Sequence, residues 1–261
     1  MDVAPPAPEP SANDGAPVRA SDPAPDGAAP GAAGEARGRR TQAFRAAIQL
    51  CRERVAASRR GRFARGMSVA IVGFAFVVAL SIRATDGPAA PVGGLLRKAA
   101  IALAWIAGGL LAHAAARDTS AEDRADGVEA LVAARGVSAS LLRGARSLGA
   151  TSQMVRSIGA PLVVLSLSTA ALAADAPSAA RRVIAAALLF AWAVVTAFTL
   201  GGIATLCARL FGSRGPSAFL AVVVGERLVA GALGIAAWSI PGALDAVLAL
   251  ALGVAGVGGG N

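Results

Sequence analysis

The chain has 261 residues, of which 55% are hydrophobic and only 16% are charged, with a formal net charge of +9. Soluble domains carry about a quarter charged residues, so this balance is typical of a membrane protein and argues against a soluble globular core. The two cysteines, Cys51 and Cys207, lie far apart and without metal-ligand spacing, so they support neither a disulfide framework nor a metal site, and no cofactor is expected.

The N-terminal segment, residues 1–36, holds eight of the 14 prolines and no apolar stretch. It has too few large apolar side chains to stabilise an ordered structure, and it lacks the charged-then-apolar pattern of a secretory signal. The sequence therefore predicts a disordered Pro/Ala-rich tail.

A basic amphipathic helix is predicted over residues 37–65. Its apolar side chains share a narrow arc at about 100° per residue, flanked by arginines. The apolar residues of this arc are Phe44, Ile48, Cys51 and Val55. Because the basic run 59–62 directly precedes an apolar segment, we expect this helix to lie in the interface of the membrane, in contact with lipid headgroups, and not to bind nucleic acid.

Six apolar stretches follow within residues 66–259, and each approaches the roughly 20 residues that a membrane-spanning helix needs. They are residues 67–82, 99–116, 157–174, 183–208, 217–240 and 243–259. None alternates with a period of two, as a strand would. The predicted fold class is therefore all-α: a polytopic membrane protein with six transmembrane helices and an N-terminal interfacial helix.

The distribution of Lys and Arg predicts the orientation. With the N-terminus inside, 18 of these residues fall on the cytoplasmic side and five outside. Positive charge in short loops is retained in the cytoplasm. We therefore expect both termini and the loop 117–156 to be cytoplasmic, in the inner (plasma) membrane, with Arg83, Arg97, Lys98, Arg181 and Arg182 outside.

The loop 117–156 is the one long charged segment between the predicted spans. Its sequence "DGVEALVAARG" places Val128, Leu131 and Val132 at helical spacing. Gly136 breaks this pattern, and Ser138 is a suitable N-cap for a second short helix. The sequence predicts two short helices joined at a glycine, which form an elbow.

The segment "DRADGVEA" resembles the first half of the CDP-alcohol phosphotransferase motif, through Asp123, Asp126, Gly127 and Ala130. That resemblance implies a membrane enzyme whose aspartates hold divalent cations. The second half of the motif is missing, because Leu131 replaces the arginine and no later aspartate pair follows. Metal-assisted phosphotransfer needs several carboxylates around the ion, so this remains the lesser alternative.

The layout as a whole, with an N-terminal helix, six spans and a charged helical loop after the second span, resembles ABC-2-type transporter permeases. The small ones without extracellular domains, such as the haem-export permease of cytochrome c maturation, are the most similar. The residues that carry the resemblance are Glu122, Asp126, Gly127, Glu129, Leu131, Gly136, Val137, Ser138, Leu141, Leu142, Arg146, Pro161 and Leu162.

The resemblance implies a non-enzymatic transport subunit, a homodimer, whose loop 117–156 docks into a separate ABC ATPase subunit. In agreement, the sequence has no phosphate-binding G-x4-G-K-[ST] motif, and Lys98 is its one lysine. The expected contact residues are Asp126, Glu129, Arg135, Ser138, Leu141, Leu142 and Arg143. The alternatives are a solvated loop that only orients the chain, and a non-catalytic membrane scaffold.

Charged side chains inside predicted spans are costly and face the helix bundle or a water-filled path. Glu226 and Arg227 lie within the fifth span, and Asp245 lies near the outer end of the sixth. They are interpreted either as a gate or as structural charges, with Asp245 as a candidate partner for Arg227. The single histidine, His113, lies near the cytoplasmic end of the second span, without companions for metal or haem binding.

Overall fold

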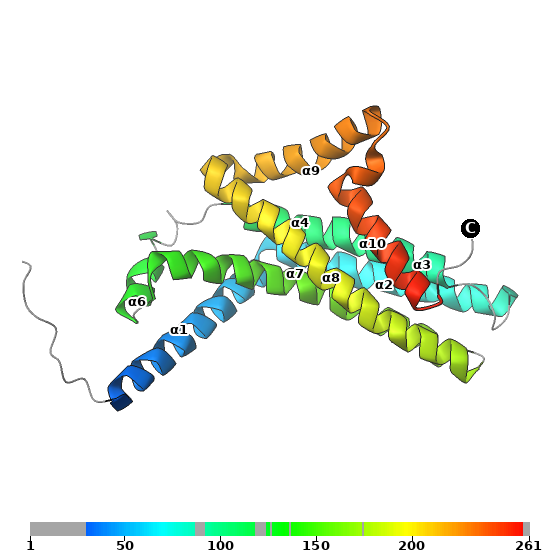
Figure 1. Cartoon of the computed structure of the whole chain (residues 1–261), viewed down its shortest axis with the longest axis horizontal. Coiled ribbons are helices and arrows are strands. Elements are labelled where there is room, and N and C mark those ends of the chain that lie inside the picture. Colours follow the sequence, from blue (N-terminus) through cyan, green and yellow to red (C-terminus); the bar gives the residue numbers. More distant parts are fainter. Residues whose placement is uncertain are drawn as a thin grey trace, which may run out of the picture. The chain divides into compact units, whose positions relative to one another are not determined.

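A computed structural model describes residues 30–86, 92–117, 124–125, 127–135, 137–173 and 175–257. Every regular element in these residues is a helix, which confirms the all-α fold class (Figure 1). The α-helices are α1 (Pro30–Ala57), α2 (Arg59–Asp86), α3 (Gly93–Ala102), α4 (Gly109–Ala115), α6 (Val128–Ala134), α7 (Ala139–Ala171), α8 (Ala176–Phe211), α9 (Gly215–Ala232) and α10 (Ile240–Val254). A π-helical stretch, η1 (Leu103–Gly108), joins α3 to α4, and the short 3-10 helices η2 (Gly212–Arg214) and η3 (Ala236–Trp238) flank α9.

The chain divides into two units, Met1–Gly38 and Arg39–Asn261. The described part of the first unit is the start of α1. The second unit holds the remaining helices, and all the contacts considered below lie within it.

Four helical segments are long and apolar enough to cross a membrane. They are Arg59–Thr85, Gly93–Ala115, Ala139–Ala171 and Ala176–Ala232, the last of which runs through α8, η2 and α9. The apolar helix α10 is shorter, with 15 residues. The apolar helices thus agree with the composition, which is typical of a membrane protein. Among the described residues, however, these segments do not make up the six separate full-length spans that were predicted.

The boundary between the first two helices differs from the expected helix over 37–65. α1 ends at Ala57, and the arginine-rich run after it begins α2, which continues as the first apolar helix. Ser58 makes the break: its Oγ donates to the Val55 carbonyl at 2.7 Å and accepts from the Gly61 amide at 3.0 Å. A Cβ on Gly61 would collide with the carbonyl oxygen of Val55, so this tight junction requires glycine.

The core lies along α7 and α8, which are antiparallel and adjacent (Figure 1). Small residues let these helices approach closely, as is usual in membrane helix packing. Gly159 faces the ring of Phe190, where a Cβ would lie 3.0 Å from the ring carbon, and Gly201 faces Thr151. The largest fully buried side chains are Leu96, Leu103, Leu111, Met154, Ile158, Leu162, Leu165, Leu189, Leu200, Phe219 and Leu248.

A proline inside α7 explains a buried hydrogen bond between helices. Pro161 has no N–H, so the carbonyl of Ser157, four residues earlier, receives no donor from its own helix. Ser68 on α2 supplies one: its Oγ donates to the Ser157 carbonyl at 3.0 Å and also lies 2.9 Å from the Ala64 carbonyl. The side chain of Ser68 is 3% exposed, so this bond ties α2 to α7 inside the bundle.

Replacing Ser68 by alanine is therefore expected to lower the free energy of unfolding by about 1–2 kcal/mol, because it leaves a buried carbonyl without a donor. Thermal unfolding in detergent measures the loss. Ser81→Ala is the matched control, since Ser81 is an exposed serine of the same helix that bonds only to its own helix. Equal Tm values for the two variants would contradict this role of Ser68.

The turn between α7 and α8 is capped by Asp175. Its carboxylate accepts a hydrogen bond from the Ser178 amide at 2.7 Å, and this bond lowers the pKa of the Asp175 carboxyl. The cap therefore stabilises the start of α8 above the ordinary pKa of an aspartate, and its contribution is lost as pH falls through the lowered pKa of the folded chain.

The last helix runs in a direction that differs from the six-span expectation. The Trp192 indole on α8 donates to the Leu244 carbonyl at 2.8 Å, and a Cβ on Gly256 would lie 3.1 Å from Arg181 Cδ. α10 thus runs antiparallel to α8 and ends beside its beginning. Six full crossings would place Arg181 and the end of the sixth span on opposite sides of the membrane.

α9 starts at the other end of α8, where Gly215 packs against the Ala116 carbonyl, and then diverges from α8 at an angle (Figure 1). α10 follows after η3. α9 and α10 measure roughly 27 Å and 22 Å, at about 1.5 Å per residue, and each is shorter than the roughly 30 Å core of a bilayer. Of the two, α10 is the helix that lies along α8 and runs toward its beginning.

Candidate functional site

The first short helix of the predicted elbow, α6, is present next to the beginning of α7. Gly127, with φ of 70°, precedes α6, and the Val137 amide donates to the Val132 carbonyl at 3.2 Å, which closes the end of that helix. Ser138 caps α7, since its Oγ accepts from the Leu141 amide at 3.4 Å, and the predicted cap is confirmed. Asp126 and Gly136 lie outside the described residues.

The second arm of the elbow is not a separate helix. It is the beginning of α7, which continues without interruption from Ala139 to Ala171 and so includes the predicted third span. The residues that join the arm of the elbow to the predicted third span are polar. They contain no proline before Pro161, so nothing in the backbone ends the helix there. Leu141 and Ala171 therefore lie on one rod, roughly 45 Å apart at about 1.5 Å per residue.

The apolar side of α1 is packed against this elbow. Ala47 on α1 and Leu142 and Ala145 on α7 form a small buried cluster, and Phe44 and Ile48 pack against it. At Gly149 the helices touch so closely that a Cβ would lie 2.9 Å from Cys51 Cβ. The stripe predicted to face lipid is thus half-buried against protein, because the continuous α7 offers it an apolar partner.

The structure sorts the expected contact residues into three groups. Leu142 is 3% exposed and belongs to the cluster with α1, so it holds the elbow together and is not on its surface. Glu129 is half-buried, and its carboxylate lies 3.5 Å from Arg124 Nε. The exposed residues among them are Arg135, Ser138, Leu141 and Arg143.

One surface residue was not expected among the contacts. Leu131 on α6 is 55% exposed, and Leu141 on α7 is 46% exposed. The helical pattern had placed Leu131 with Val128 and Val132 on the apolar side, but only Val132 packs against the α1 cluster. We call the exposed set Leu131, Arg135, Ser138, Leu141 and Arg143 the elbow surface.

The charged residues of the last two helices have specific partners. The Glu226 Oε1 accepts from the Ile240 amide at 2.8 Å, so its charge lies at the N-terminus of α10, where the helix dipole favours an anion. Its Oε2 is buried without a hydrogen-bond partner among the described residues. Arg227, one residue later, is exposed.

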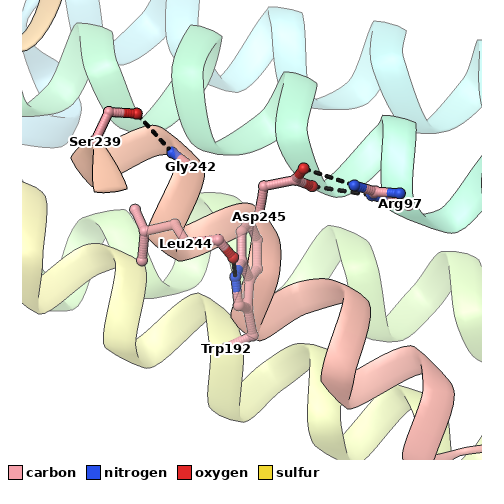
Figure 2. A network of polar contacts seen from close by, with 6 residues as sticks. All are labelled: Arg97, Trp192, Ser239, Gly242, Leu244 and Asp245. Carbon is pink, nitrogen blue, oxygen red and sulfur yellow. Dashed lines mark hydrogen bonds and ion pairs between the residues drawn. The ribbon is translucent and has the colours of Figure 1, made fainter. Parts of the chain in front are cut away.

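Asp245 pairs with Arg97, and not with Arg227 as expected (Figure 2). The Arg97 Nε and Nη2 donate to the two Asp245 oxygens at 2.9 and 2.6 Å, which is the bidentate geometry that gives Arg–carboxylate pairs their strength. Sequence analysis had assigned Arg97 to the outer flank of a span. The structure starts α3 at Gly93 and so places Arg97 within that helix, against α10.

Two further bonds hold the start of α10 (Figure 2). Ser239 Oγ accepts from the Gly242 amide at 3.0 Å, and the buried Trp192 indole bonds to the Leu244 carbonyl. With Arg97 and Glu226, these contacts tie a helix of 15 residues to α3, α8 and α9. Glu226 and Asp245 thus both contribute to holding α10 in place, whereas Arg227 does not take part in these contacts.

No group of three or more His, Cys, Asp or Glu side chains that could hold a metal ion occurs within the described residues. Asp123 and Asp126, on which the phosphotransferase alternative depends, are not among those residues. His113 is half-buried on α4.

Comparisons with protein-family models, with curated proteins and with solved structures give no match for this chain. The function proposed below therefore depends on the chain's own features. Those features are the elbow surface and its continuity with α7.

Proposed function

We propose that this chain is the membrane-spanning permease subunit of an ABC-type exporter, and that a separate ATPase subunit binds the elbow surface. The observation that carries this proposal is the unbroken α7, which joins the exposed Leu141 to the buried core of the bundle. An ATPase needs a rigid element to move the transmembrane helices, and a flexible connector would absorb the motion.

The composition of the elbow surface supports docking to another protein. Leu131 and Leu141 are exposed apolar side chains on helices, and Arg135 and Arg143 lie among them. Apolar anchors give binding energy, while the charges steer and orient the partner. Closure of an ATPase around α6 would displace the start of α7 and tilt that helix against α8, a shear movement of packed helices.

The proposed orientation places the elbow in the cytoplasm of a cell with an inner (plasma) membrane, because the arginines gather at that end of the helices. Six crossings would return the C-terminus to the cytoplasm. The position of Gly256 beside Arg181 favours a different arrangement, in which α9 and α10 form a single fifth passage that ends outside. We propose the second arrangement.

Cysteine labelling of intact spheroplasts distinguishes the two arrangements. In a background in which Cys51 and Cys207 are replaced by serine, single cysteines are placed at Ser138, Ser178 and Val257. An impermeant maleimide is expected to label positions 178 and 257 at once, and position 138 only after the membrane is opened. If position 257 is labelled only after the membrane is opened, the arrangement with six crossings is correct. If position 138 is labelled in intact spheroplasts, the proposal that a cytoplasmic ATPase docks on the elbow surface is wrong.

Two copies are proposed for the working transporter. The outer face of α2 leaves Val69, Phe74 and Val77 between 58% and 74% exposed, so this face is available to lipid or to a second copy. Crosslinking of single cysteines on that face, with a monomeric membrane protein as the standard, tests the dimer.

Partner capture tests the function directly. The tagged chain is extracted from its native membrane in a mild detergent, and co-purifying proteins are identified by mass spectrometry. We expect a Walker-motif ATPase with the wild type and a loss of about tenfold or more with Leu131→Ser/Leu141→Ser, since each truncated anchor weakens binding by on the order of 1 kcal/mol or more.

The matched control is Leu50→Ser, because Leu50 on α1 is 48% exposed but lies outside the elbow surface. This variant should retain the ATPase. If no ATPase accompanies the wild type under conditions that preserve a known ABC complex, the chain is instead a non-catalytic membrane scaffold.

A further inference from the structure

A groove of about 780 Å³ lies between the end of α1, the first half of α2 and the middle of α7. Neither the elbow surface nor the ion pair of α10 contributes a residue to it. Its lining changes from basic at one end to apolar at the other, and this order indicates the class of molecule that it fits.

The basic end of the groove is lined by three arginines and one carboxylate, Glu53. The arginines come from three helices and are Arg52, Arg65 and Arg156. Glu53 has a partner in Gln49, whose Nε2 donates to it at 3.0 Å. The Arg65 Nη2 donates to the Ala56 carbonyl at 2.9 Å, which holds the guanidinium in place and uses only one of its N–H donors. This end therefore carries a net positive charge and a positioned donor group.

The apolar end of the groove opens sideways. Its residues are Val69, Val72 and Gly73 on α2 and Ala160, Pro161 and Val164 on α7. Val69 and Val164 are 74% and 56% exposed, so this end faces the surroundings of the bundle and not its core. In a membrane those surroundings are the hydrocarbon of the bilayer, which gives an acyl chain direct access.

The two helices that form the walls present the same order of residues in the same direction. α2 and α7 run the same way (Figure 1), and the hydrogen bond from Ser68 to the Ser157 carbonyl sets their register. Arg65 and Arg156 precede this bond on their helices, and the apolar residues follow it. From Arg156 to Val164 the groove extends roughly 12 Å at about 1.5 Å per residue, which is most of one leaflet's share, about 15 Å, of the hydrocarbon core.

Buried polar side chains form the floor beside the basic end. Gln153 is 7% exposed and Ser157 is 6% exposed. Within the described part of the chain, the Gln153 amide makes one hydrogen bond, from Nε2 to Ser157 Oγ at the long distance of 3.4 Å. Its oxygen and its second N–H remain for a molecule in the groove, and a buried amide with unused capacity favours such a partner.

We propose that this groove binds one anionic phospholipid, with its phosphate beside the three arginines and one acyl chain along the valines of α2 and α7. Arginine donors match phosphate oxygens, and basic residues at a membrane surface favour anionic lipids. A second copy of the chain fits the groove less well, because its net charge of +9 gives it few acidic side chains to place there. The proposal does not depend on ATPase docking, since the groove and the elbow surface share no residue.

The full-length chain in nanodiscs of equal phosphatidylcholine and phosphatidylglycerol tests the proposal. Native mass spectrometry identifies the lipids that the protein retains, and we expect preferential retention of one phosphatidylglycerol. A trace of phosphatidylglycerol with a photoreactive acyl chain locates it, with crosslinks expected at residues 69–73 and 160–164. Equal retention of the two lipids, or crosslinks spread evenly over the exposed faces of α2 and α8, would overturn the proposal, because the lipid would then be ordinary bilayer lipid.

The variant that blocks the apolar end is Gly73→Phe. A Cβ on Gly73 meets no atom within 4 Å, so the ring fills the groove without disturbing the helices. Retention of phosphatidylglycerol should fall at least about fivefold, because several methylene groups of the chain lose their apolar contacts. Gly66→Phe is the matched control, since Gly66 is an equally open glycine of α2 that does not line the groove. Undiminished retention by Gly73→Phe would show that the lipid lies elsewhere.

The variant that tests the basic end is Arg156→Gln. It should lower the ratio of retained phosphatidylglycerol to phosphatidylcholine about fivefold, the effect typical of one basic residue near an anionic surface. Arg62→Gln removes an exposed arginine of α2 outside the groove and should leave the ratio unchanged. If Gly73→Phe instead converts a dimer to a monomer and leaves lipid retention unchanged, the groove is an interface between copies and the lipid proposal is wrong.

Discussion

Replacing Asp245 by alanine is expected to destabilise the folded chain by roughly 2–3 kcal/mol. The substitution leaves Arg97 as an unpaired cation within an apolar helix, and an arginine inside a membrane segment costs about 2.5–3.5 kcal/mol on insertion scales. Part of that penalty is relieved because the guanidinium is 45% exposed and lies about one turn from the start of the apolar segment Gly93–Ala115. The expected result is a clear fall in Tm, with early loss of α10 contacts.

A double variant separates the charge from the packing. Arg97→Leu/Asp245→Leu removes both charges and keeps apolar volume, so it should recover most of the stability that Asp245→Ala loses. Arg227→Ala is the control, since Arg227 is exposed. Thermal unfolding in detergent, followed by tryptophan fluorescence, to which Trp192 near the pair contributes, measures all three. If Arg227→Ala destabilised the chain as much as Asp245→Ala, the pairing with Arg97 would be in doubt.

The neighbouring leucines Leu141 and Leu142 are expected to differ in how much their replacement by alanine lowers the stability of the fold. Leu142→Ala opens a cavity between α7 and α1 and should lower stability by about 2–4 kcal/mol, as large-to-small changes in cores do. Leu141→Ala removes a half-exposed side chain and should change stability by less than about 0.5 kcal/mol.

The second measurement on this pair is partner capture. Leu141→Ala should reduce recovery of the ATPase although the chain stays fully folded, whereas Leu142→Ala should act through the loosening of α1 from the elbow. Proteolysis at the α1–α2 junction reports that loosening, because Ser58 and Gly61 hold the two helices in a tight turn. Similar Tm values for the two variants would contradict the assignment of Leu142 to the elbow core.

Specific contacts hold helices together at both ends of the bundle. At the elbow end, the apolar side chains of α1 pack against the first turns of α7. At the other end, Arg97 and Asp245 fix α10 against α3. In the proposed permease, α7 would therefore move between these two contact regions.

The sequence by itself determined the features that depend on local interactions. Composition and the apolar runs predicted an all-helical chain with the character of a membrane protein, since backbone groups in lipid must be satisfied within each helix. Ser138 was recognisable as a cap because capping needs only the next three residues. The short helix α6 followed from the spacing of Val128 and Val132, whereas the second short helix of the predicted elbow is instead the beginning of α7.

Only the tertiary structure decided the features that depend on which helices are neighbours. The apolar stripe of α1 fits lipid or protein equally well by its pattern, and the extension of α7 beyond the core made protein its partner. Asp245 forms its ion pair with Arg97 and not with Arg227, because α10 packs against α3. The direction of α10 was likewise fixed by its contacts with Trp192 and Arg181, since hydropathy records how long a helix is but not where it ends.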